Sequence, residues 1–292
     1  MHKVIGVIGN KRKKGIGEII SDLNSWLRGK GIGLVVWDDL SDVVSGVEFA
    51  AIEDVGKKSD LVVALGGDGT LLRAARAAGS KPILGVNIGS LGFLTEVSTD
   101  EMKKVLNDVF AGNCGYEKRM NLHASVFRND ECVADYDALN DIVINKGALS
   151  RVIEMKVRID GNYLATYTAD GLIVSTPTGS TAYSLSAGGP IVNPCMAAIV
   201  ATPICPHTLA IRPMILSGEQ KLDVEINTGH SLFGEPEVTL TIDGQIGFRL
   251  ASGDRIEFRK SDRVTVLVVS RQRSFYDVLR EKLRWGDIRR NR

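Results

Sequence analysis

The chain has 292 residues, 44% of them hydrophobic and 24% charged, with a formal net charge of +1, so it has material for one large domain or two ordinary ones. The near-zero charge argues against a nucleic-acid partner held by a basic surface, and no run approaches the roughly 18 apolar residues of a membrane span. Four cysteines (Cys114, Cys132, Cys195, Cys205) lack C-x-x-C or zinc spacing, and the first residues are too poor in apolar side chains for a signal peptide, so we expect a cytoplasmic protein without disulfides or zinc.

The first half of the chain alternates short apolar runs with amphipathic segments. These runs predict strands at residues 3–8, 33–37, 61–65 and 83–87, and helices at residues 17–28 and 99–111. Strands separated by helices indicate a doubly wound parallel sheet. A basic cluster at residues 11–14 follows the first strand. It is compatible with a solvated loop or, since α/β folds bind ligands at strand ends, with a position near a triphosphate.

Residues 61–70 read Leu-Val-Val-Ala-Leu-Gly-Gly-Asp-Gly-Thr and precede a helical stretch. This order predicts a strand, a tight turn and a helix, where glycines allow the backbone to approach a phosphate. Asp68 is compatible with a helix N-cap or with a carboxylate that accepts a proton or holds a metal beside a nucleotide. The turn is neither a Walker A loop nor a G-x-G-x-x-G dinucleotide motif.

A second glycine-rich connection, residues 85–96, leaves the next strand at the same predicted sheet edge. By itself it is compatible with a tight connection that tucks Phe93 and Leu94 into the core.

Beyond about residue 120 the pattern changes to short or alternating apolar runs. Strands are expected at residues 122–127, 136–139, 141–144, 153–159, 164–167, 172–175, 222–226, 238–242, 255–259 and 265–269. Asp160-Gly161 and Asp243-Gly244 predict hairpin turns. We therefore expect an α/β domain over residues 1–119, an all-β domain over residues 120–268 and an amphipathic helical tail over residues 269–292, with a cleft between the domains as the default ligand site.

Two polar segments interrupt the β-rich half. Asn140 and Asp141 stand side by side before an apolar run, an arrangement compatible with a capped turn or with hydrogen bonds to a base and a ribose. Residues 170–190 run from a strand into a loop crowded with Ser, Thr and Gly and then into a helix predicted at residues 181–187. Such a loop presents N–H and O–H donors to an anion or a sugar.

These segments carry a resemblance. GGDGT after a buried strand resembles the signature of a kinase superfamily that includes NAD kinases, 6-phosphofructokinases and diacylglycerol or sphingosine kinases. Residues 170–190 resemble the glycine-rich motif of NAD kinases, and residues 274–285 resemble the tail that in many bacterial members returns to the first domain. The resemblance covers almost the full chain and implies a bacterial-type NAD kinase.

The resemblance implies transfer of the γ-phosphoryl of ATP, or of another phosphoryl donor, to the 2′-hydroxyl of the adenosine ribose of NAD, giving NADP. It implies that Asp68 is the general base, and that Gly66, Gly67, Gly69 and Thr70 bind phosphate. The NAD-binding residues that it implies are Asp68, Gly69, Arg73, Phe93, Asn140, Asp141, Arg151, Asp170, Thr181, Ala182, Tyr183, Ser184, Leu185, Ser186 and Gln245. Thr168 stands where many members have a basic residue.

A divalent ion, Mg²⁺, is expected to bridge the triphosphate without an all-protein cage. The resemblance also implies a homodimer or homotetramer whose partners are small molecules and neither nucleic acid nor membrane. Two other readings remain open: a lipid kinase of the diacylglycerol type, and a dinucleotide sensor that binds NAD or NADP without catalysis.

Overall fold

The structure is a computed structural model, and it describes residues 3–89, 91–147, 152–208, 210–228, 237–269 and 273–284. The chain divides into two compact units, one of residues 1–118 and 265–292 and the other of residues 119–264. The first unit is therefore discontinuous in sequence. Two long strands, β7 (Gly115–Arg128) and β18 (Arg255–Val269), carry the chain across the two unit boundaries.

The first unit is built on a parallel sheet, as the sequence predicts. Its strands are β1 (Val4–Gly9), β2 (Gly33–Trp37), β3 (Glu48–Ala50), β4 (Leu61–Gly66) and β5 (Ile83–Asn87), in the order β5-β4-β1-β2-β3. All four pairings between them are parallel. Beyond β5, the short strand β6 (Val97–Ser98) and Leu267 of β18 also pair in parallel. The strands read as continuous apolar runs because both faces of the sheet are covered.

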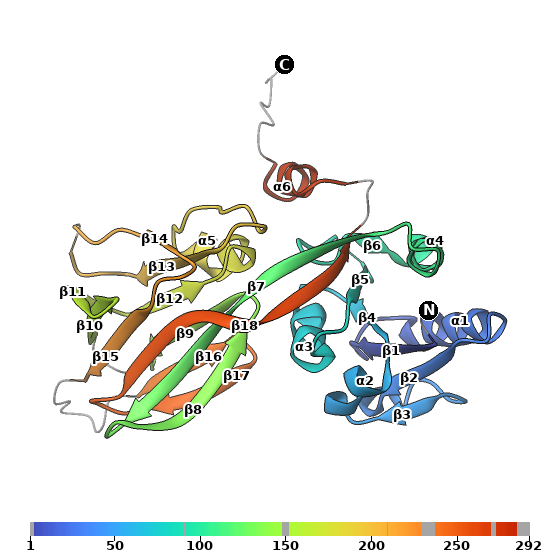
Figure 1. The fold of residues 1–292 in the computed structure, drawn as a ribbon, viewed down its shortest axis with the longest axis horizontal. Coiled ribbons are helices and arrows are strands. Elements are labelled where there is room, and N and C mark those ends of the chain that lie inside the picture. The colour runs from blue at the N-terminus through green and yellow to red at the C-terminus, as the bar shows by residue number, and fades with distance from the viewer. Residues whose placement is uncertain are drawn as a thin grey trace, which may run out of the picture. The chain divides into compact units, whose positions relative to one another are not determined.

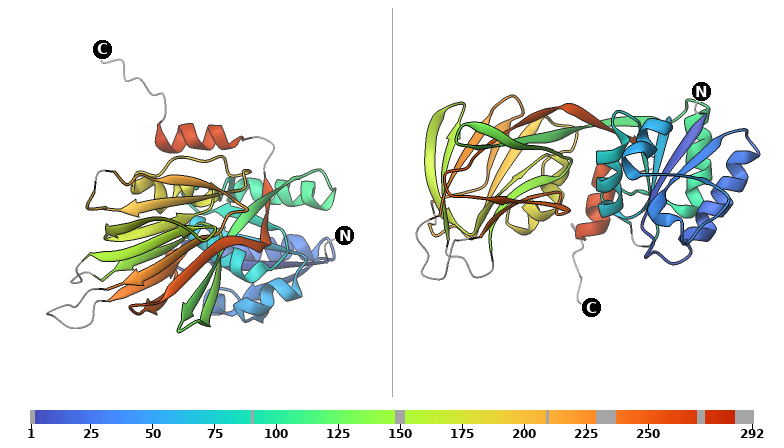
Figure 2. Two further views of the ribbon diagram at one scale, coloured as in Figure 1. Left: turned by 60° about the vertical axis from the view of Figure 1, so that its left-hand side comes forward. Right: turned by 90° about the horizontal axis from the view of Figure 1, so that it is seen from below.

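Helices cover both faces of this sheet (Figures 1 and 2). They are α1 (Ile16–Arg28), α2 (Ile52–Lys58), α3 (Asp68–Ala78) and α4 (Thr99–Phe110). Leu23 of α1 and Leu106 of α4 share one core with Val7 of β1. A Cβ on the neighbouring residue Gly6, which faces the other way, would lie 2.7 Å from Val55 of α2. The sheet is thus doubly wound, as predicted.

The remaining elements of the first unit are short. Residues 38–58, for which no element was predicted, contain the 3₁₀ turn η1 (Asp38–Leu40) as well as β3 and α2. The tail helix α6 (Phe275–Leu283) begins with a capping box, in which Asp277 N donates to Ser274 Oγ and Ser274 N donates to the Asp277 carboxylate. Over the described ranges, no helix has the length and apolarity needed to cross a bilayer.

The second unit contains two antiparallel layers. One is a sheet in the order β14-β13-β12-β9-β16-β17, and the other includes β11, β10, β15 and β18 with β7 and β8. The bounds are β8 (Glu131–Ala138), β9 (Asp141–Lys146), β10 (Ile153–Ile159), β11 (Asn162–Ala169), β12 (Gly171–Ser175), β13 (Ala198–Ile204), β14 (Met214–Ser217), β15 (Leu222–Asn227), β16 (Val238–Ile242) and β17 (Ile246–Leu250).

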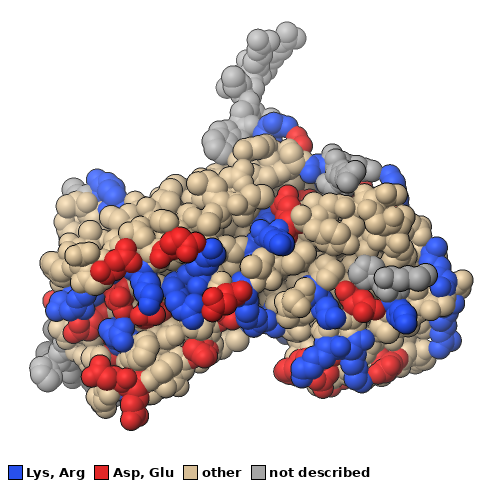
Figure 3. All heavy atoms as spheres, viewed as in Figure 1, with Lys and Arg blue, Asp and Glu red and all other residues tan. Residues whose placement is uncertain are grey.

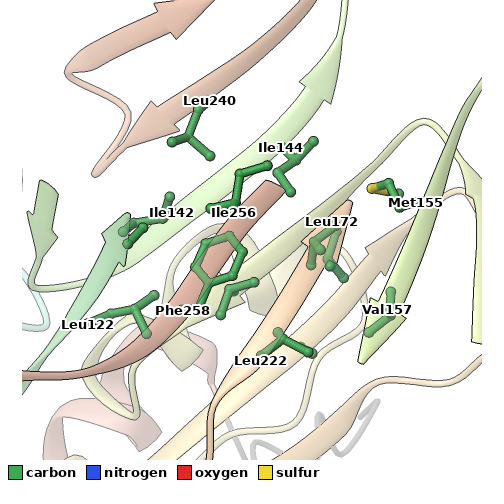
Figure 4. Close-up of a cluster of buried hydrophobic side chains, with 14 of the residues drawn as sticks. Leu122, Ile142, Ile144, Met155, Val157, Leu172, Leu222, Leu240, Ile256 and Phe258 are labelled. Atoms are coloured by element: carbon green, nitrogen blue, oxygen red, sulfur yellow. The ribbon is translucent and has the colours of Figure 1, made fainter. Parts of the chain in front are cut away.

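The core of the second unit lies where the inner faces of the layers meet. Phe258 and Ile256 of β18 point toward Ile142 of β9 and Leu240 of β16, and all four are fully buried (Figure 4). Alternate residues of each strand supply this core, as in other sandwiches. In Figure 3 Lys and Arg are interspersed with Asp and Glu on the visible face of this unit, and ion pairs such as Arg255–Asp223 join neighbouring strands.

The predicted hairpins are confirmed, whereas some strand and helix predictions are wrong. Asp160-Gly161 and Asp243-Gly244 form the β10–β11 and β16–β17 turns with positive φ at both residues of each pair. Residues 255–259 and 265–269 belong to one strand, β18, instead of two. The helix predicted at residues 181–187 is a 3₁₀ turn, η2 (Thr178–Thr181), followed by the single helical turn α5 (Tyr183–Ser186). No residue ranges were predicted for strands β13, β14 and β17.

Candidate active site

The turn between β4 and α3 is a tight connection that depends on glycine. A Cβ on Gly66 would overlap Thr70 Oγ1, and Thr70 N donates to Gly67 O at 2.9 Å. Gly67 is the N-cap residue of α3, and no side chain caps this helix. The alternative that Asp68 is the N-cap is therefore wrong. A helix that begins after a glycine turn without a capping side chain leaves backbone N–H groups free to bind an anion.

The Asp68 carboxylate points to the loop that follows β5. Its Oδ2 accepts a hydrogen bond from Phe93 N at 2.8 Å, and its Oδ1 accepts from Leu94 N at 3.0 Å, Thr95 N at 3.2 Å and Thr95 Oγ1 at 3.1 Å. A Cβ on Gly92 would overlap Oδ1, so this loop can approach the carboxylate only with glycine at that position. Asp68 thus fixes the loop that carries Phe93.

This anchoring leaves Asp68 with acceptor capacity. An ionised carboxylate offers about four lone-pair sites. Within the described residues, Oδ1 takes three donors and Oδ2 takes one, and Asp68 is only half-buried. Oδ2 can therefore accept one further hydrogen bond, or a proton, from a bound hydroxyl.

The turn also lies at the switch point of the parallel sheet. From β1 the chain runs outward through β2 and β3, and then returns to β4 on the opposite side of β1. Ligands of open α/β sheets bind at the carboxyl ends of strands at such a point. Of the basic cluster, Lys11 is paired with Asp39 at 2.8 Å, whereas Lys13 Nζ lies 3.6 Å from the position of a Cβ on Gly89, in the loop after β5. The position of Lys13 thus favours the second interpretation of the basic cluster, in which it lies near a triphosphate.

Arg73 is placed differently from the other predicted residues of this unit. It is exposed on α3, and its guanidinium lies over the Trp37 ring, 5.2 Å from the ring centroid.

In the second unit, two motifs far apart in sequence meet around Asn140. Thr176 N donates to Asn140 O at 2.9 Å, and a Cβ on Gly179 would overlap that same carbonyl. From the other side, the Asp243 carboxylate accepts hydrogen bonds from the backbone N–H groups of residues 139, 140 and 141. The structure therefore brings together the Asn140–Asp141 pair, the start of the Ser/Thr/Gly loop and the Asp-Gly-Gln turn.

Asp141 is a buried carboxyl group of this cluster with a perturbed pKa. It is 5% exposed, and burial raises its pKa to about 7, with the negative charge of Asp243 as the second cause. Ser175 of β12 lies directly opposite Asp141 in the sheet. Perturbed carboxyl groups of this kind concentrate at functional sites.

Several polar atoms around Asp141 are buried without a hydrogen-bond partner within the described residues. They are Asn140 Oδ1, Ser175 Oγ and Thr178 Oγ1. Native proteins leave few such atoms unpaired, so their concentration here marks a place built to meet a polar group. Ser175, Thr178 and Asp243 were not predicted as site residues from the sequence. The only sequence signals for them were the many hydroxyl residues around Ser175 and Thr178 and the Asp-Gly turn that begins at Asp243.

The predicted residues 181–186 do not all face the same way. Tyr183 is 44% exposed and Ser186 is exposed, whereas the Ser184 hydroxyl is buried against Thr202 Oγ1 at 2.9 Å. Thr181 Oγ1 donates to Thr178 O at 3.3 Å, and Ala182 and Leu185 are half-buried.

Asp170 lies at the opposite end of β12 from Ser175. With a rise of about 3.3 Å per residue, the strand separates the two residues by about 17 Å. The Asp170 carboxylate is 3.5 Å from Lys146 Nζ, so a positive charge stands near it although residue 168 is threonine. Gln245 is the last residue of the β16–β17 turn and is half-buried. Arg151 lies outside the described residues.

A metal cage of protein side chains is absent from the described ranges. No group of three or more His, Cys, Asp or Glu side chains is gathered there as metal ligands would be. The carboxylate at the turn between β4 and α3 is that of Asp68, and its Oδ1 already accepts three hydrogen bonds from the loop after β5.

Comparison with known proteins agrees with this geometry. The family of the ATP-NAD kinase N-terminal domain matches residues 5–114, and that of the ATP-NAD kinase C-terminal domain matches residues 139–270. The chain is 47% identical over 271 residues to an NAD kinase of Geobacter sulfurreducens, covering 92% of this chain and 94% of the relative. It is 43% identical over 290 residues to an NAD kinase of Syntrophotalea carbinolica, covering 98% and 99%.

Two solved structures share the fold. A crystal structure of yeast NADH kinase complexed with NADH has a TM-score of 0.88 and 28% identity, covering 99% of this chain and 90% of that one. A structure of an NAD kinase from Archaeoglobus fulgidus in complex with ATP has a TM-score of 0.75 and 24% identity, covering 96% and 98%, and shows the fold alone. Because family matches span both halves and relatives align over most of their length, the chain belongs to the ATP-NAD kinase family.

Proposed function

We propose that the protein is an NAD kinase that transfers the γ-phosphoryl of ATP, or of another phosphoryl donor, to the 2′-hydroxyl of the adenosine ribose of NAD, producing NADP. Family membership and the names of the relatives support the activity. The observation that carries the mechanism is the Asp68 carboxylate, held by the loop after β5 with acceptor capacity left on Oδ2.

Asp68 is the proposed general base. A ribose hydroxyl is a weak nucleophile, so transfer depends on alignment and charge neutralisation, with proton removal as the new bond forms. The ribose oxygen forms a bond to the γ-phosphorus, the bond from that phosphorus to the β-phosphate oxygen breaks, and ADP leaves. The hydroxyl proton passes to Asp68 Oδ2. The three hydrogen bonds on Oδ1 keep the carboxylate oriented throughout.

Phosphate binding is assigned to the turn at residues 66–70 and to the uncapped start of α3. Lys13 supports this assignment because it lies beside the loop after β5. Mg²⁺ bound through ATP would neutralise the phosphate oxygens. The protein contributes the oriented backbone N–H groups and the tight turn that lets phosphate approach.

The dinucleotide is assigned to the second group of residues. Asn140 can hydrogen-bond a base edge, and Asp141 can accept from ribose hydroxyls. Asp170, at the far end of β12, is assigned to the nicotinamide side, and Thr181, Tyr183 and Ser186 to contacts along the dinucleotide. By family resemblance we infer that the protein is cytoplasmic and forms a homodimer or homotetramer. Light scattering on the purified chain would test the oligomeric state.

The decisive assay incubates the purified protein with NAD, ATP and Mg²⁺ and measures NADP with an NADP-specific dehydrogenase. NADP formation that requires ATP supports the proposal. A parallel reaction with diacylglycerol in place of NAD tests the lipid-kinase reading. Phosphorylated lipid without NADP, or NAD binding without NADP formation from either ATP or polyphosphate, would each overturn the proposed activity. A third reaction with polyphosphate in place of ATP identifies the donor.

A further inference from the structure

Asp243 occupies a position that its role as a turn residue does not explain. It is the first residue of the β16–β17 turn, with φ of 49°, yet its side chain is turned inward and is 7% exposed. Its backbone N–H donates to Asp141 O at 2.9 Å, so it stands next to Asp141. Burying a carboxylate costs free energy unless hydrogen-bond donors compensate for the lost water. The donors around Asp243 therefore explain why it can be buried.

Among those partners are three successive backbone N–H groups. Asn140 N donates to Oδ1 at 2.8 Å, Asp141 N to Oδ1 at 3.3 Å and Leu139 N to Oδ2 at 3.3 Å. Hydrogen bonds to an ionised acceptor are roughly twice as strong as neutral ones. The carboxylate therefore holds residues 139–141 along their whole length.

Two of these residues, Leu139 and Asn140, are also held from the opposite side by Thr176. Its Oγ1 donates to Leu139 O at 2.6 Å, its N–H donates to Asn140 O at 2.9 Å, and its Oγ1 also accepts from Gly179 N at 3.1 Å. The backbone at residues 139–140 is thus fixed by Asp243 on one flank and Thr176 on the other. By contrast, Asn140 Oδ1 has no partner within the described residues.

We propose that Asp243 is a positioning residue for the NAD substrate: its carboxylate fixes the backbone of residues 139–141 and so presents the Asn140 and Asp141 side chains to the nucleoside end of NAD. This inference rests on the proposed function. Asp243 does not touch the substrate in this scheme and takes no part in phosphoryl transfer. Its removal therefore weakens NAD binding and spares the chemical step.

Asp243→Asn tests the proposal because the amide keeps the shape of the side chain but replaces one acceptor oxygen by a donor that faces N–H groups. The loss of charged hydrogen bonds predicts that Kd and KM for NAD rise about tenfold to hundredfold. We expect kcat and KM for ATP to stay within about threefold of wild type. The Kd is measured by calorimetry with NAD alone, which requires no turnover.

Asp160→Asn is the matched control. Asp160 is also the first residue of a hairpin turn with φ of 49°, is also followed by glycine, and also caps nearby groups, accepting from Lys221 N at 2.9 Å and Gln220 Nε2 at 3.0 Å. It is exposed and far from residues 139–141 in the sheet order. Its Kd for NAD should equal that of wild type.

The outcomes separate this inference from the proposed function. Wild-type protein that binds NAD but forms no NADP overturns the kinase proposal, while the calorimetric comparison still judges Asp243. An unchanged Kd in Asp243→Asn, or an equal weakening in both variants, overturns the positioning role. If Asp243→Asn does not fold, Thr176→Val should weaken NAD binding severalfold and Thr176→Ser, which keeps the hydroxyl, should restore it. Equal affinities of those two variants would overturn the proposal.

Discussion

Asp68 in the first unit and Asp243 in the second accept hydrogen bonds from the same kind of donor, a run of backbone N–H groups, and differ in their exposure. Each carboxylate binds three successive backbone N–H groups of a distant loop, residues 93–95 for Asp68 and residues 139–141 for Asp243. Asp68 is half-buried, whereas Asp243 is 7% exposed and stands beside the carboxyl group of Asp141.

This difference shows how one structural device can serve two purposes. A carboxylate that closes a loop at a half-buried turn retains a lone pair that a substrate hydroxyl can use. A carboxylate that closes a loop in the interior has no such access, and acts through the side chains of the loop that it holds. The loop residue is apolar in one case, Phe93, and polar in the other, Asn140 and Asp141.

The largest expected effect follows from removing the carboxylate that we propose as the general base, Asp68 of the first unit. Asp68→Asn should lower kcat about 10²- to 10⁴-fold, the usual contribution of general base catalysis, with a smaller change in the Kd for NAD. Steady-state kinetics and calorimetry measure the two quantities. Thr95→Val is the control, because it removes one donor to Oδ1 and keeps the carboxylate. A kcat of Asp68→Asn within threefold of wild type would exclude Asp68 as the base.

The second prediction concerns Asp141 and pH. Burial raises its pKa from 3.8 to about 7, so between these values the folded protein binds the proton that the unfolded chain has released. Stability from this group therefore falls as pH rises from about 4 to about 7, by on the order of 4 kcal/mol. Asp141→Asn should gain stability over wild type as pH increases across this window, as measured by urea unfolding at pH 4.5 and 8.

Asp160→Asn should change the pH dependence of the free energy of unfolding in the opposite direction. The backbone hydrogen bond from Lys221 lowers the pKa of Asp160, so the stability that this carboxylate adds is lost as pH falls. If the free energy of unfolding of wild type and of Asp141→Asn depended on pH in the same way over the whole range, the raised pKa of the buried Asp141 carboxyl group would be contradicted.

The smallest expected effect concerns the approach of the loop to Asp68. Gly92→Ala places a Cβ where Asp68 Oδ1 and Thr95 Oγ1 lie, so the loop must move, at a cost of about 1–3 kcal/mol. Gly33→Ala is the control, because the nearest atom to its Cβ is 3.5 Å away. Thermal unfolding compares the two variants. Equal melting temperatures would show that the loop yields without cost.

Much of the fold could be predicted because its determinants are local. The apolar runs at residues 61–65 and 83–87 indicate strands buried on both faces, and the two Asp-Gly pairs indicate hairpins through their backbone preference. The polar residues 260–263 led to a prediction of two strands where the structure has one, because β18 continues across this stretch into the other unit. Strand β13 contains Pro203, which weakens the strand pattern.

The candidate site could be predicted only as far as its motifs are contiguous. The turn at residues 66–70 and the segment at residues 170–190 were recognisable by composition and resemblance. The contact of Asp243 with Asn140 joins residues 103 positions apart, and no local pattern predicts it. Likewise, the sequence left Asp68 open between an N-cap and a functional carboxylate, and the hydrogen bonds to residues 93–95 decided against the cap.

The insertion of the second unit within the first has a consequence for how the protein is made. Ile83 of β5 pairs with Leu267 of β18, which a ribosome adds 184 residues later. The parallel sheet of the first unit therefore emerges with β5 still lacking this partner, while the complete second unit, residues 119–264, is available to fold before it. Translation order thus favours a protein whose β-sandwich matures first and whose strand β5 gains its β18 partner last.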